Sequence, residues 1–137
     1  MRPTLVDTDI LSMFFRGHET VAANFHTHAQ KFGIIHLSII TFYEILSGLK
    51  HRDAKKQLDL FLRFASQNHV INLSEKSVTI SSELYAEQRK KGESIDDIDL
   101  LIAGIALAND FVLATNNVSH FKKIKSLTIA NWSQKRF

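Results

Sequence analysis

Cysteine is absent from this 137-residue sequence. Its absence excludes disulfides, thiolate zinc sites and cysteine nucleophiles, and it suits a reducing compartment, so we expect a cytoplasmic protein. Glycine is sparse, and the five glycines are scattered rather than grouped in a phosphate-binding loop. No G-x-G-x-x-G, G-x-x-x-x-G-K-S/T or G-x-S-x-G sequence occurs, which disfavours nucleotide binding of the usual kinds and a serine hydrolase.

Long hydrophobic segments are also missing. The longest apolar run extends from Leu100 to Ala108, including Gly104, and is too short to cross a bilayer. Asp7 places a carboxylate where a signal peptide requires an apolar stretch. We therefore expect a protein that is neither exported nor attached to a membrane.

The composition is that of an ordinary globular protein. Hydrophobic residues make up 45% and charged residues 23% of the chain, and no stretch resembles a linker or a disordered tail. We therefore predict a single domain over residues 1–137. Lysine and arginine outnumber aspartate and glutamate by 17 to 14, which is compatible with a nucleic-acid partner and equally with a solvated basic surface.

Short apolar segments alternate with amphipathic ones along the chain. The segments predicted to be strands are 4–6, 34–37, 70–73, 111–114 and 127–129. Helices are predicted between them, and a chain that alternates in this way builds a parallel sheet covered by helices. The sequence therefore predicts a three-layer α/β/α sandwich with a central, mainly parallel sheet of four to five short strands.

Helix boundaries and apolar stripes refine this prediction. Thr8 or Asp9 is the expected N-cap of the first helix, and Ser38 and Ser74 are expected to cap two later ones. The helix after Ser38 has an apolar stripe of Ile39, Phe42, Tyr43, Leu46 and Leu49. The helix after it presents Leu58, Phe61, Leu62 and Ala65.

Polar side chains follow the predicted strands. Asp7 and Asp9 follow the first strand, and Thr115, Asn116 and Asn117 follow the fourth. In parallel α/β sheets the ligand crevice lies beyond the carboxyl ends of the strands. We therefore expect these two groups of residues to converge at one edge of the sheet.

Further carboxylates are placed to face the same crevice. Glu44 lies in the first turns of the helix after Ser38, and Asp96, Asp97 and Asp99 precede the apolar helix. Gathered carboxylates repel one another unless a cation neutralises them, and Mg²⁺ prefers oxygen ligands. The pattern therefore predicts a site for Mg²⁺ or Mn²⁺ and hydrolysis of a phosphodiester without a protein nucleophile.

Each acid also has a purely structural explanation. Asp7 and Asp9 suit an N-cap, Asp96 or Asp97 suits the N-cap of the apolar helix, and Glu44 suits a solvated helix surface. Asp99 fits such an explanation least, because it begins the most buried helix, where an unpaired charge is costly.

Four segments carry a family resemblance. They are, in chain order, LVDTDILS, TFYEILSG, DLLIAGIAL and LATNNVSHF. In this order and at these separations they resemble the PIN-domain ribonucleases, and among them the VapC toxins of bacterial toxin–antitoxin pairs. The resemblance extends from Thr4 to Trp132. It implies an endoribonuclease, dependent on Mg²⁺ or Mn²⁺, that acts as the toxin of a VapBC-type pair.

The resemblance also implies roles for individual residues. Asp7, Glu44 and Asp99 match the metal-binding, catalytic carboxylates of the PIN pattern. Asp9 matches a supporting position beside the first acid, and Thr115 matches the hydroxyl residue at the end of the fourth strand.

One position departs from the family pattern. Asn117 stands where many PIN domains carry a fourth acid, and an amide brings no negative charge. This departure argues against a tightly held second ion, and Asp96 or Asp97 would have to compensate.

The resemblance further implies protein partners. It predicts a homodimer and a VapB-type antitoxin whose C-terminal segment blocks the acidic groove, with the possibility of a larger toxin–antitoxin assembly. An exposed apolar strip on the early helices would be the physical counterpart, with Phe14 and Phe15 or Phe61 and Phe64 as its members.

Histidines and basic residues complete the list of candidates. His26 and His28 are expected to be surface or half-buried imidazoles, and His120 a solvated loop residue near the crevice. The basic clusters are Lys50, Arg52, Lys55 and Lys56; Arg89, Lys90 and Lys91; and Lys122, Lys123 and Lys125. Such clusters beside an acidic centre would attract an RNA backbone.

Two alternative functions remain open from the sequence. A PIN-like module that has lost catalysis and binds RNA or protein would explain Asn117. A receiver-type phosphoacceptor domain also gathers acids around Mg²⁺, but it requires a lysine directly after a late strand, and the late lysines 122–125 do not follow Ala114 directly.

Overall fold

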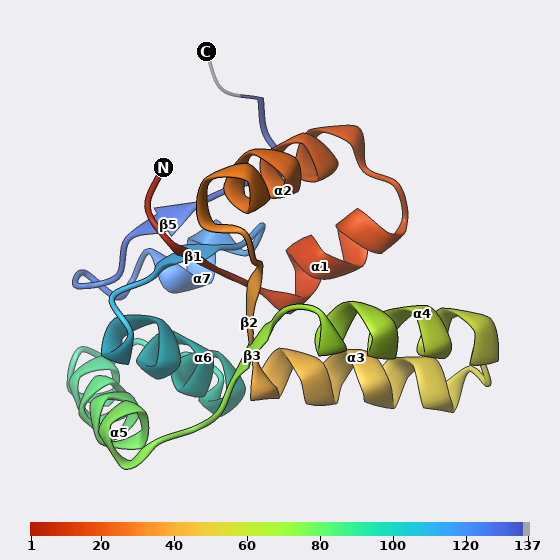
Figure 1. Cartoon of the computed structure of the whole chain (residues 1–137). Helices are drawn as coiled ribbons and strands as arrows, with labels where there is room; N and C mark the ends of the chain where they lie inside the picture. Colours follow the sequence, from red (N-terminus) through yellow and green to blue (C-terminus); the bar gives the residue numbers. More distant parts are fainter. Residues whose placement is uncertain (136–137) are drawn as a thin grey trace.

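The computed structural model describes residues 1–135 and builds them around one parallel sheet (Figure 1). The strands are β1 (Thr4–Val6), β2 (His36–Ser38), β3 (His69–Ile71), β4 (Val112–Ala114) and β5 (Ile129–Ala130). They lie in the order β3-β2-β1-β4-β5, and each neighbouring pair is parallel. The central position of β1 brings the first acids between β2 and β4.

Helices connect the strands and cover the sheet. In chain order they are α1 (Thr8–Phe15), α2 (Glu19–Phe32), α3 (Ile39–His51), α4 (Lys55–Ser66), α5 (Glu75–Lys90), α6 (Asp97–Ala108) and α7 (Val118–Phe121). In Figure 1, α3 and α4 lie side by side and extend away from the sheet, while α5 and α6 form a separate pair. The predicted α/β architecture is confirmed.

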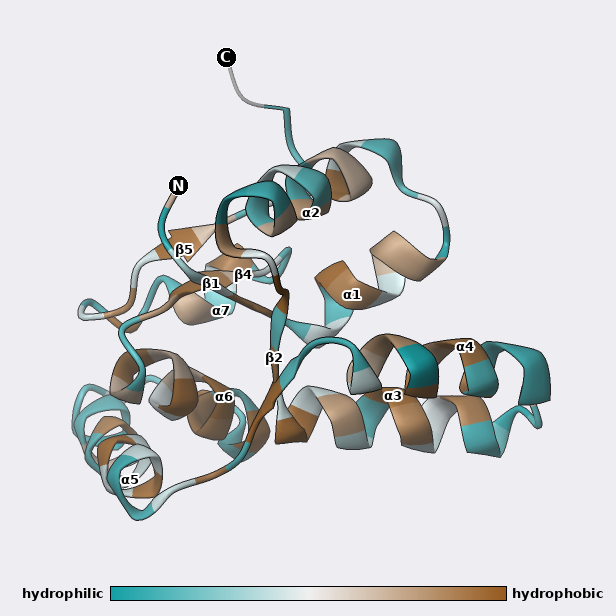
Figure 2. Cartoon of the chain, in the orientation of Figure 1, coloured by the Kyte–Doolittle hydropathy of each residue, from teal (hydrophilic) through white to brown (hydrophobic). Residues whose placement is uncertain are grey.

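The alternation of side chains along the strands divides the core into two parts. Leu5 and Leu113 belong to a buried cluster with residues of α5 and α6. Val6 and Ala114, the next residues along the same strands, belong to a second cluster with α1, α2, α4 and Trp132. Because successive strand residues point to opposite faces, the helices form layers on both sides of the sheet. Figure 2 shows that the strands and α6 are mostly hydrophobic, whereas hydrophilic and hydrophobic residues alternate along α5.

Close contact between α5 and α6 depends on a glycine. A Cβ atom added at Gly104 would lie 2.5 Å from the carbonyl oxygen of Ser77 and would also collide with the Ser81 hydroxyl. That hydroxyl lies 2.8 Å from the carbonyl oxygen of Leu100, to which it can donate a hydrogen bond across the helix pair. The missing side chain therefore allows α6 to approach α5 and to enter the core.

Several local predictions are corrected by the structure. Neither Thr8 nor Asp9 is the N-cap of α1. The cap is Asp7, as its alternative structural explanation predicted, and the helix begins at Thr8. Two members of the predicted apolar stripes are exposed instead, with 64% of Tyr43 and 43% of Leu62 accessible to solvent. Strands β2, β3 and β5 begin and end one or two residues away from the ends of the predicted segments 34–37, 70–73 and 127–129.

His28 is a further correction. It is fully buried, and its Nε2 accepts a hydrogen bond of 3.1 Å from the backbone N–H of Thr4. A surface or half-buried imidazole was the sequence-based expectation. The burial of His28 instead joins α2 to the start of β1, whereas His26 is exposed as predicted.

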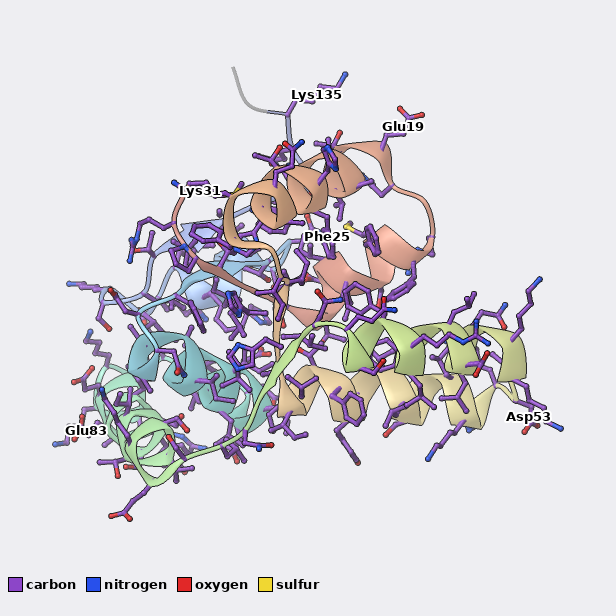
Figure 3. All side chains as sticks on the ribbon, in the orientation of Figure 1. Glu19, Phe25, Lys31, Asp53, Glu83 and Lys135 are labelled. Atoms are coloured by element: carbon purple, nitrogen blue, oxygen red, sulfur yellow. The ribbon has the colours of Figure 1, made fainter. Side chains whose placement is uncertain are left out.

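The charged side chains labelled in Figure 3 lie on the outside of the molecule. In Figure 3, Glu19, Lys31, Asp53 and Glu83 point away from the ribbon, whereas Phe25 points inward between α2 and α1. Over residues 1–135, the helices are all too short or too polar to span a bilayer.

Candidate active site

Asp7 lies directly after β1 and is held on both carboxylate oxygens. Its Oδ1 accepts a 2.8 Å hydrogen bond from the backbone N–H of Thr8, and its Oδ2 accepts one of 2.8 Å from the hydroxyl of Thr115 after β4. Only 6% of the residue is exposed. The pairing of β1 with β4 therefore brings the predicted Asp7 and Thr115 into direct contact.

Asp9 connects α1 to the loop after β4. Its Oδ1 accepts a hydrogen bond of 2.7 Å from the backbone N–H of Ile10, and its Oδ2 accepts one of 3.0 Å from the backbone N–H of Asn116. The predicted convergence of the two post-strand segments is therefore present in the structure.

Glu44 reaches the same region through a threonine that the sequence interpretation treated only as a possible helix cap. The hydroxyl of Thr8 donates a 2.6 Å hydrogen bond to Oε1 of Glu44, and the hydroxyl oxygen of Thr41 lies 2.9 Å from that of Thr8. Because Thr8 uses its proton on Glu44, Thr41 donates to Thr8. Thr41 lies one turn before Glu44 on α3, and this spacing is the sequence signal that could have identified it.

Asp99 lies in the first turn of α6, beside α7. Its Oδ2 is 3.8 Å from Nδ1 of His120, and that same nitrogen is 2.9 Å from the side-chain amide nitrogen of Asn117. The backbone N–H of Asn117 donates a 3.0 Å hydrogen bond to the hydroxyl of Thr115. Asn117 therefore orients two neighbours of the acids. His120 is exposed and near the crevice as predicted, but it lies in α7 rather than in a loop.

Asp96 occupies a different position. It is exposed, and its carboxylate caps α6 by accepting a 2.8 Å hydrogen bond from the backbone N–H of Ile98. It influences Asp99 by charge repulsion.

The carboxylates are electrostatically unfavourable together. Burial raises the pKa of Asp7 to about 7, with a further contribution from Asp9, while hydrogen bonds from Thr115 and Thr8 oppose the change. Burial also raises the pKa of Asp9. Burial, followed by repulsion from Asp96, raises the pKa of Asp99, and His120 opposes it. A bound cation would therefore stabilise the ionised form of these carboxylates.

The chemistry of these donors fits Mg²⁺ or Mn²⁺. Asp7, Asp9, Glu44 and Asp99 offer only oxygen ligands, which both ions accept. Over residues 1–135, no lysine or arginine forms an ion pair with them. In the same range, no three acidic or histidine side chains are already gathered closely enough to hold one ion, so binding would require side-chain adjustment.

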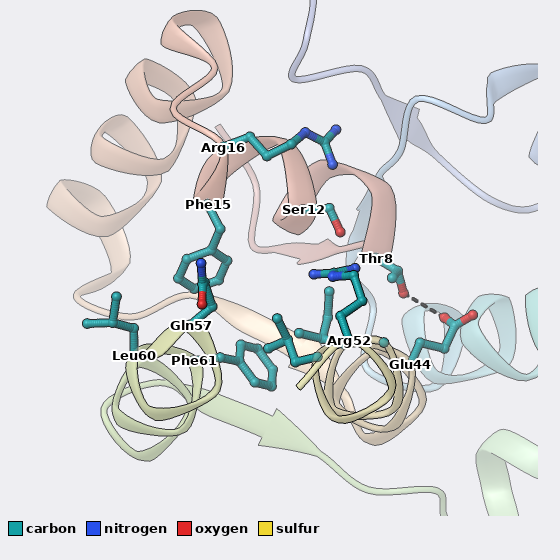
Figure 4. A pocket seen from close by; sticks show the side chains of 12 residues that line it. Thr8, Ser12, Phe15, Arg16, Glu44, Arg52, Gln57, Leu60 and Phe61 are labelled. Carbon is teal, nitrogen blue, oxygen red and sulfur yellow. Dashed lines mark hydrogen bonds between the residues drawn. The ribbon is translucent and has the colours of Figure 1, made fainter. Parts of the chain in front are cut away.

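A pocket of about 500 Å³ extends from this site between α1, α3 and α4. Figure 4 shows Thr8 and Glu44 at one end, joined by a hydrogen bond, and Phe15, Leu60 and Phe61 toward the other. Arg16 and Arg52 also line it. The pocket therefore combines apolar walls with two cationic side chains beside an acid.

A second hollow gathers basic residues. Its volume is about 400 Å³, and it is lined by Lys91, Glu93, Lys122, Lys123 and Lys125. The end of α5 and the segment after α7 are distant in sequence, so the fold merges two of the predicted basic clusters.

Comparison with known proteins places this geometry in a family. The family model described as "PIN domain" matches residues 4–127. The chain is 33% identical over 134 residues to "Ribonuclease VapC2" of Rickettsia felis, covering 95% of this chain and 98% of that protein.

Solved structures agree with the sequence comparison. A structure of VapBC2 from Rickettsia felis, bound to a promoter DNA fragment, is similar with a TM-score of 0.81 and 30% identity over 94% of this chain and 98% of that one. DNA-bound VapBC from Salmonella typhimurium has the same fold, with a TM-score of 0.85 and 24% identity over 96% of this chain and 99% of the other.

Proposed function

This chain belongs to the PIN domain family, and from that premise we propose that it is an endoribonuclease that uses Mg²⁺ or Mn²⁺ and serves as the toxin of a VapBC-type toxin–antitoxin pair. Asp7, Glu44 and Asp99 are the proposed metal ligands and catalytic residues. Asp9, Thr115, Asn117 and Asp96 are the proposed supporting residues.

The observation that carries this proposal is the convergence of carboxylates that, over residues 1–135, form no ion pair with a lysine or arginine. Asp7 is buried with a pKa of about 7, and a bound cation would offset the cost of its charge to folding. Enzymes tolerate such costs where charge is needed for chemistry. When bound, the divalent ion would supply Lewis-acid stabilisation of a phosphate group.

The residues of the chain have separate tasks in this proposal. Thr115 fixes the orientation of Asp7, and Thr8 fixes that of Glu44. Asp9 holds the loop after β4 against α1. Held carboxylates lose less entropy when they bind a ligand, so these contacts favour a defined site.

The lysine hollow supports RNA as the substrate. Lys91, Lys122, Lys123 and Lys125 line it together with Glu93. The last three lysines follow α7, and α7 carries His120 beside Asp99. Clustered lysines attract the phosphate backbone without reading its sequence. The proposed substrate is therefore RNA that spans from the hollow to the acids.

The pocket beside Glu44 supports an antitoxin partner. Phe15 is 42% and Leu60 49% exposed at its wall, so an apolar segment would gain from covering them. Arg16 and Arg52 suit a segment that also carries acidic groups. We propose that a VapB-type antitoxin binds here and blocks Glu44, and that the chain forms a homodimer that can enter a larger assembly. Solved relatives are VapBC complexes.

Cleavage of labelled total RNA by the purified chain tests the proposed activity. We expect discrete products with Mg²⁺ or Mn²⁺, none with EDTA, and none from Asp99→Asn. Asp97→Asn is the matched control, because Asp97 carries the same group two residues away but is exposed. We expect it to retain cleavage.

The same experiment distinguishes the proposed ribonuclease from the alternative, a non-catalytic binding module. Folded protein that retains RNA, yields no products with any divalent ion and contains no bound inhibitor would favour the module. Cleavage that is equal in Asp99→Asn and in the unaltered chain would reject the assigned site.

A further inference from the structure

Two histidines meet at the edge of the sheet opposite the carboxylates. His36 begins β2 and His69 begins β3, and the two residues are aligned partners in this parallel strand pair. Their Nδ1 atoms are 3.0 Å apart. The acids follow the carboxyl ends of the strands, whereas this pair lies at the amino ends.

Both imidazoles extend from strand starts that are hydrogen-bonded to each other. The backbone N–H of His69 donates a 2.9 Å hydrogen bond to the carbonyl oxygen of Ile35. The side-chain oxygen of Asn68 accepts one of 2.9 Å from the backbone N–H of Ile35. These reciprocal contacts fix the two strand starts relative to each other.

The ring of His36 is further held by its neighbours. It stacks on Phe111 with a centroid distance of 4.6 Å and an interplanar angle of 23°. On another side it meets the ring of the buried His28 edge-on, at 5.6 Å and 89°. The ring is therefore oriented before any ligand arrives, which lowers the entropy lost on binding.

The separation of the two nitrogens matches that of neighbouring ligands on one metal ion. Zinc–imidazole bonds are about 2.0–2.1 Å, so two nitrogens on one ion lie about 2.9 Å apart at a right angle and about 3.4 Å apart at the tetrahedral angle. The observed 3.0 Å is within this interval. Rotation of the exposed His69 ring would allow both lone pairs to face one ion.

We propose that His36 and His69 form a bidentate site for Zn²⁺ or a similar late first-row divalent ion, separate from the carboxylate site. Imidazole nitrogen suits Zn²⁺, Ni²⁺ and Cu²⁺, whereas Mg²⁺ prefers oxygen. His28 is not the third ligand, because its Nε2 accepts the N–H of Thr4 and the proton of the neutral ring is therefore on Nδ1. Over residues 1–135 no third acidic or histidine side chain completes the set, so water occupies the remaining positions.

The protonation state of His36 supports this assignment. Burial lowers its pKa to about 4, with further contributions from His69 and His28. The ring is therefore neutral near pH 7, the form in which imidazole binds a metal. An ion shared between the two rings would link β3, an edge strand, to β2 and would stabilise the folded chain in proportion to its occupancy.

Titration of the full chain with Zn²⁺, in excess Mg²⁺ that saturates oxygen sites, tests the proposal by calorimetry. We expect one Zn²⁺ per chain and a rise in Tm with Zn²⁺. His69→Ala should weaken binding by at least about tenfold, because even the loss of a residue behind a ligand weakens metal sites about 10- to 100-fold. His69 is exposed, so the variant should fold. His51→Ala removes another exposed histidine and should bind Zn²⁺ normally.

A spectroscopic measurement identifies the ligands independently of affinity. Electron paramagnetic resonance of bound Cu²⁺ should show nitrogen coupling from two imidazoles, reduced to one in His69→Ala. Equal Zn²⁺ affinity in the unaltered chain and His69→Ala, loss of binding only in Asp99→Asn, or no Zn²⁺ binding at all would each overturn the proposal. In the last case the two rings share a hydrogen bond only.

Discussion

Replacement of Asp7 by asparagine should stabilise the metal-free protein at neutral and higher pH. The amide is neutral and nearly isosteric with the carboxyl group. Its oxygen can accept the N–H of Thr8, and its nitrogen can donate to the hydroxyl oxygen of Thr115. The Thr115 proton, which now goes to Asp7, can then be accepted by Asp9. The variant also removes the repulsion between Asp7 and Asp9.

The magnitude follows from the raised pKa. In the folded chain the pKa of Asp7 is raised from 3.8 to about 7, so between these values the folded chain keeps a proton that the unfolded chain releases. The cost to stability is absent below about pH 4, grows as the pH rises and is complete above about pH 7. A difference of about three pKa units corresponds to about 4 kcal/mol. Relaxation around the charge reduces this, and we expect a gain of about 2 kcal/mol at about pH 8.

Thermal unfolding in EDTA over a pH series measures this effect. A gain of about 2 kcal/mol raises Tm by about 8 °C in a domain of this size, and the gain should vanish near pH 4. Mg²⁺ should reduce the difference in Tm between Asp7→Asn and the unaltered chain, because Mg²⁺ binds the carboxylate better than the amide. Asp97→Asn, an exposed change of the same kind, should leave Tm nearly unchanged. Equal or lower Tm for Asp7→Asn at about pH 8 would refute the reasoning.

Other substitutions test the contacts around the site and in the core. Thr115→Val removes the donor to Asp7 and the acceptor of a backbone N–H, so urea unfolding should show a loss of about 2 kcal/mol; a loss below about 0.5 kcal/mol would contradict this role. Gly104→Ala should cost about 2–3 kcal/mol in the same assay, because its methyl group collides with α5. Gly48→Ala, with 3.8 Å to the nearest side-chain atom, should instead stabilise α3 by up to about 1 kcal/mol, and equal effects of the two changes would reject the packing argument. Ser74→Ala removes a capping box from α5 and should lower the free energy of unfolding by about 1 kcal/mol, so unchanged stability would show that the cap is not needed.

Much of the fold and part of the candidate site were predictable from local sequence patterns. Strands β1 and β4 were predicted at or close to their observed positions, and Ser38 and Ser74 were correctly predicted as helix caps. These features depend on residues within a few positions of one another, where periodicity and capping preferences act directly. The convergence of Asp7 with Thr115 followed from one further rule, the shared edge of parallel strands.

Other features depend on contacts between distant segments, and local patterns do not encode them. The exposure of Tyr43 and the burial of His28 depend on which helix covers each face. The pairing of Thr8 with Glu44 joins residues that are 36 positions apart. Only the packing of α1 against α3 makes that hydrogen bond possible.

The sequence by itself determined the order of strands and helices, the acids at their ends and the family to which the chain belongs. The tertiary structure decided how those acids are held and charged, which lysines share a hollow and which histidines meet. The physical reason is that secondary structure reflects neighbouring residues, whereas burial, repulsion and metal-ligand distances are set by strand register and helix packing.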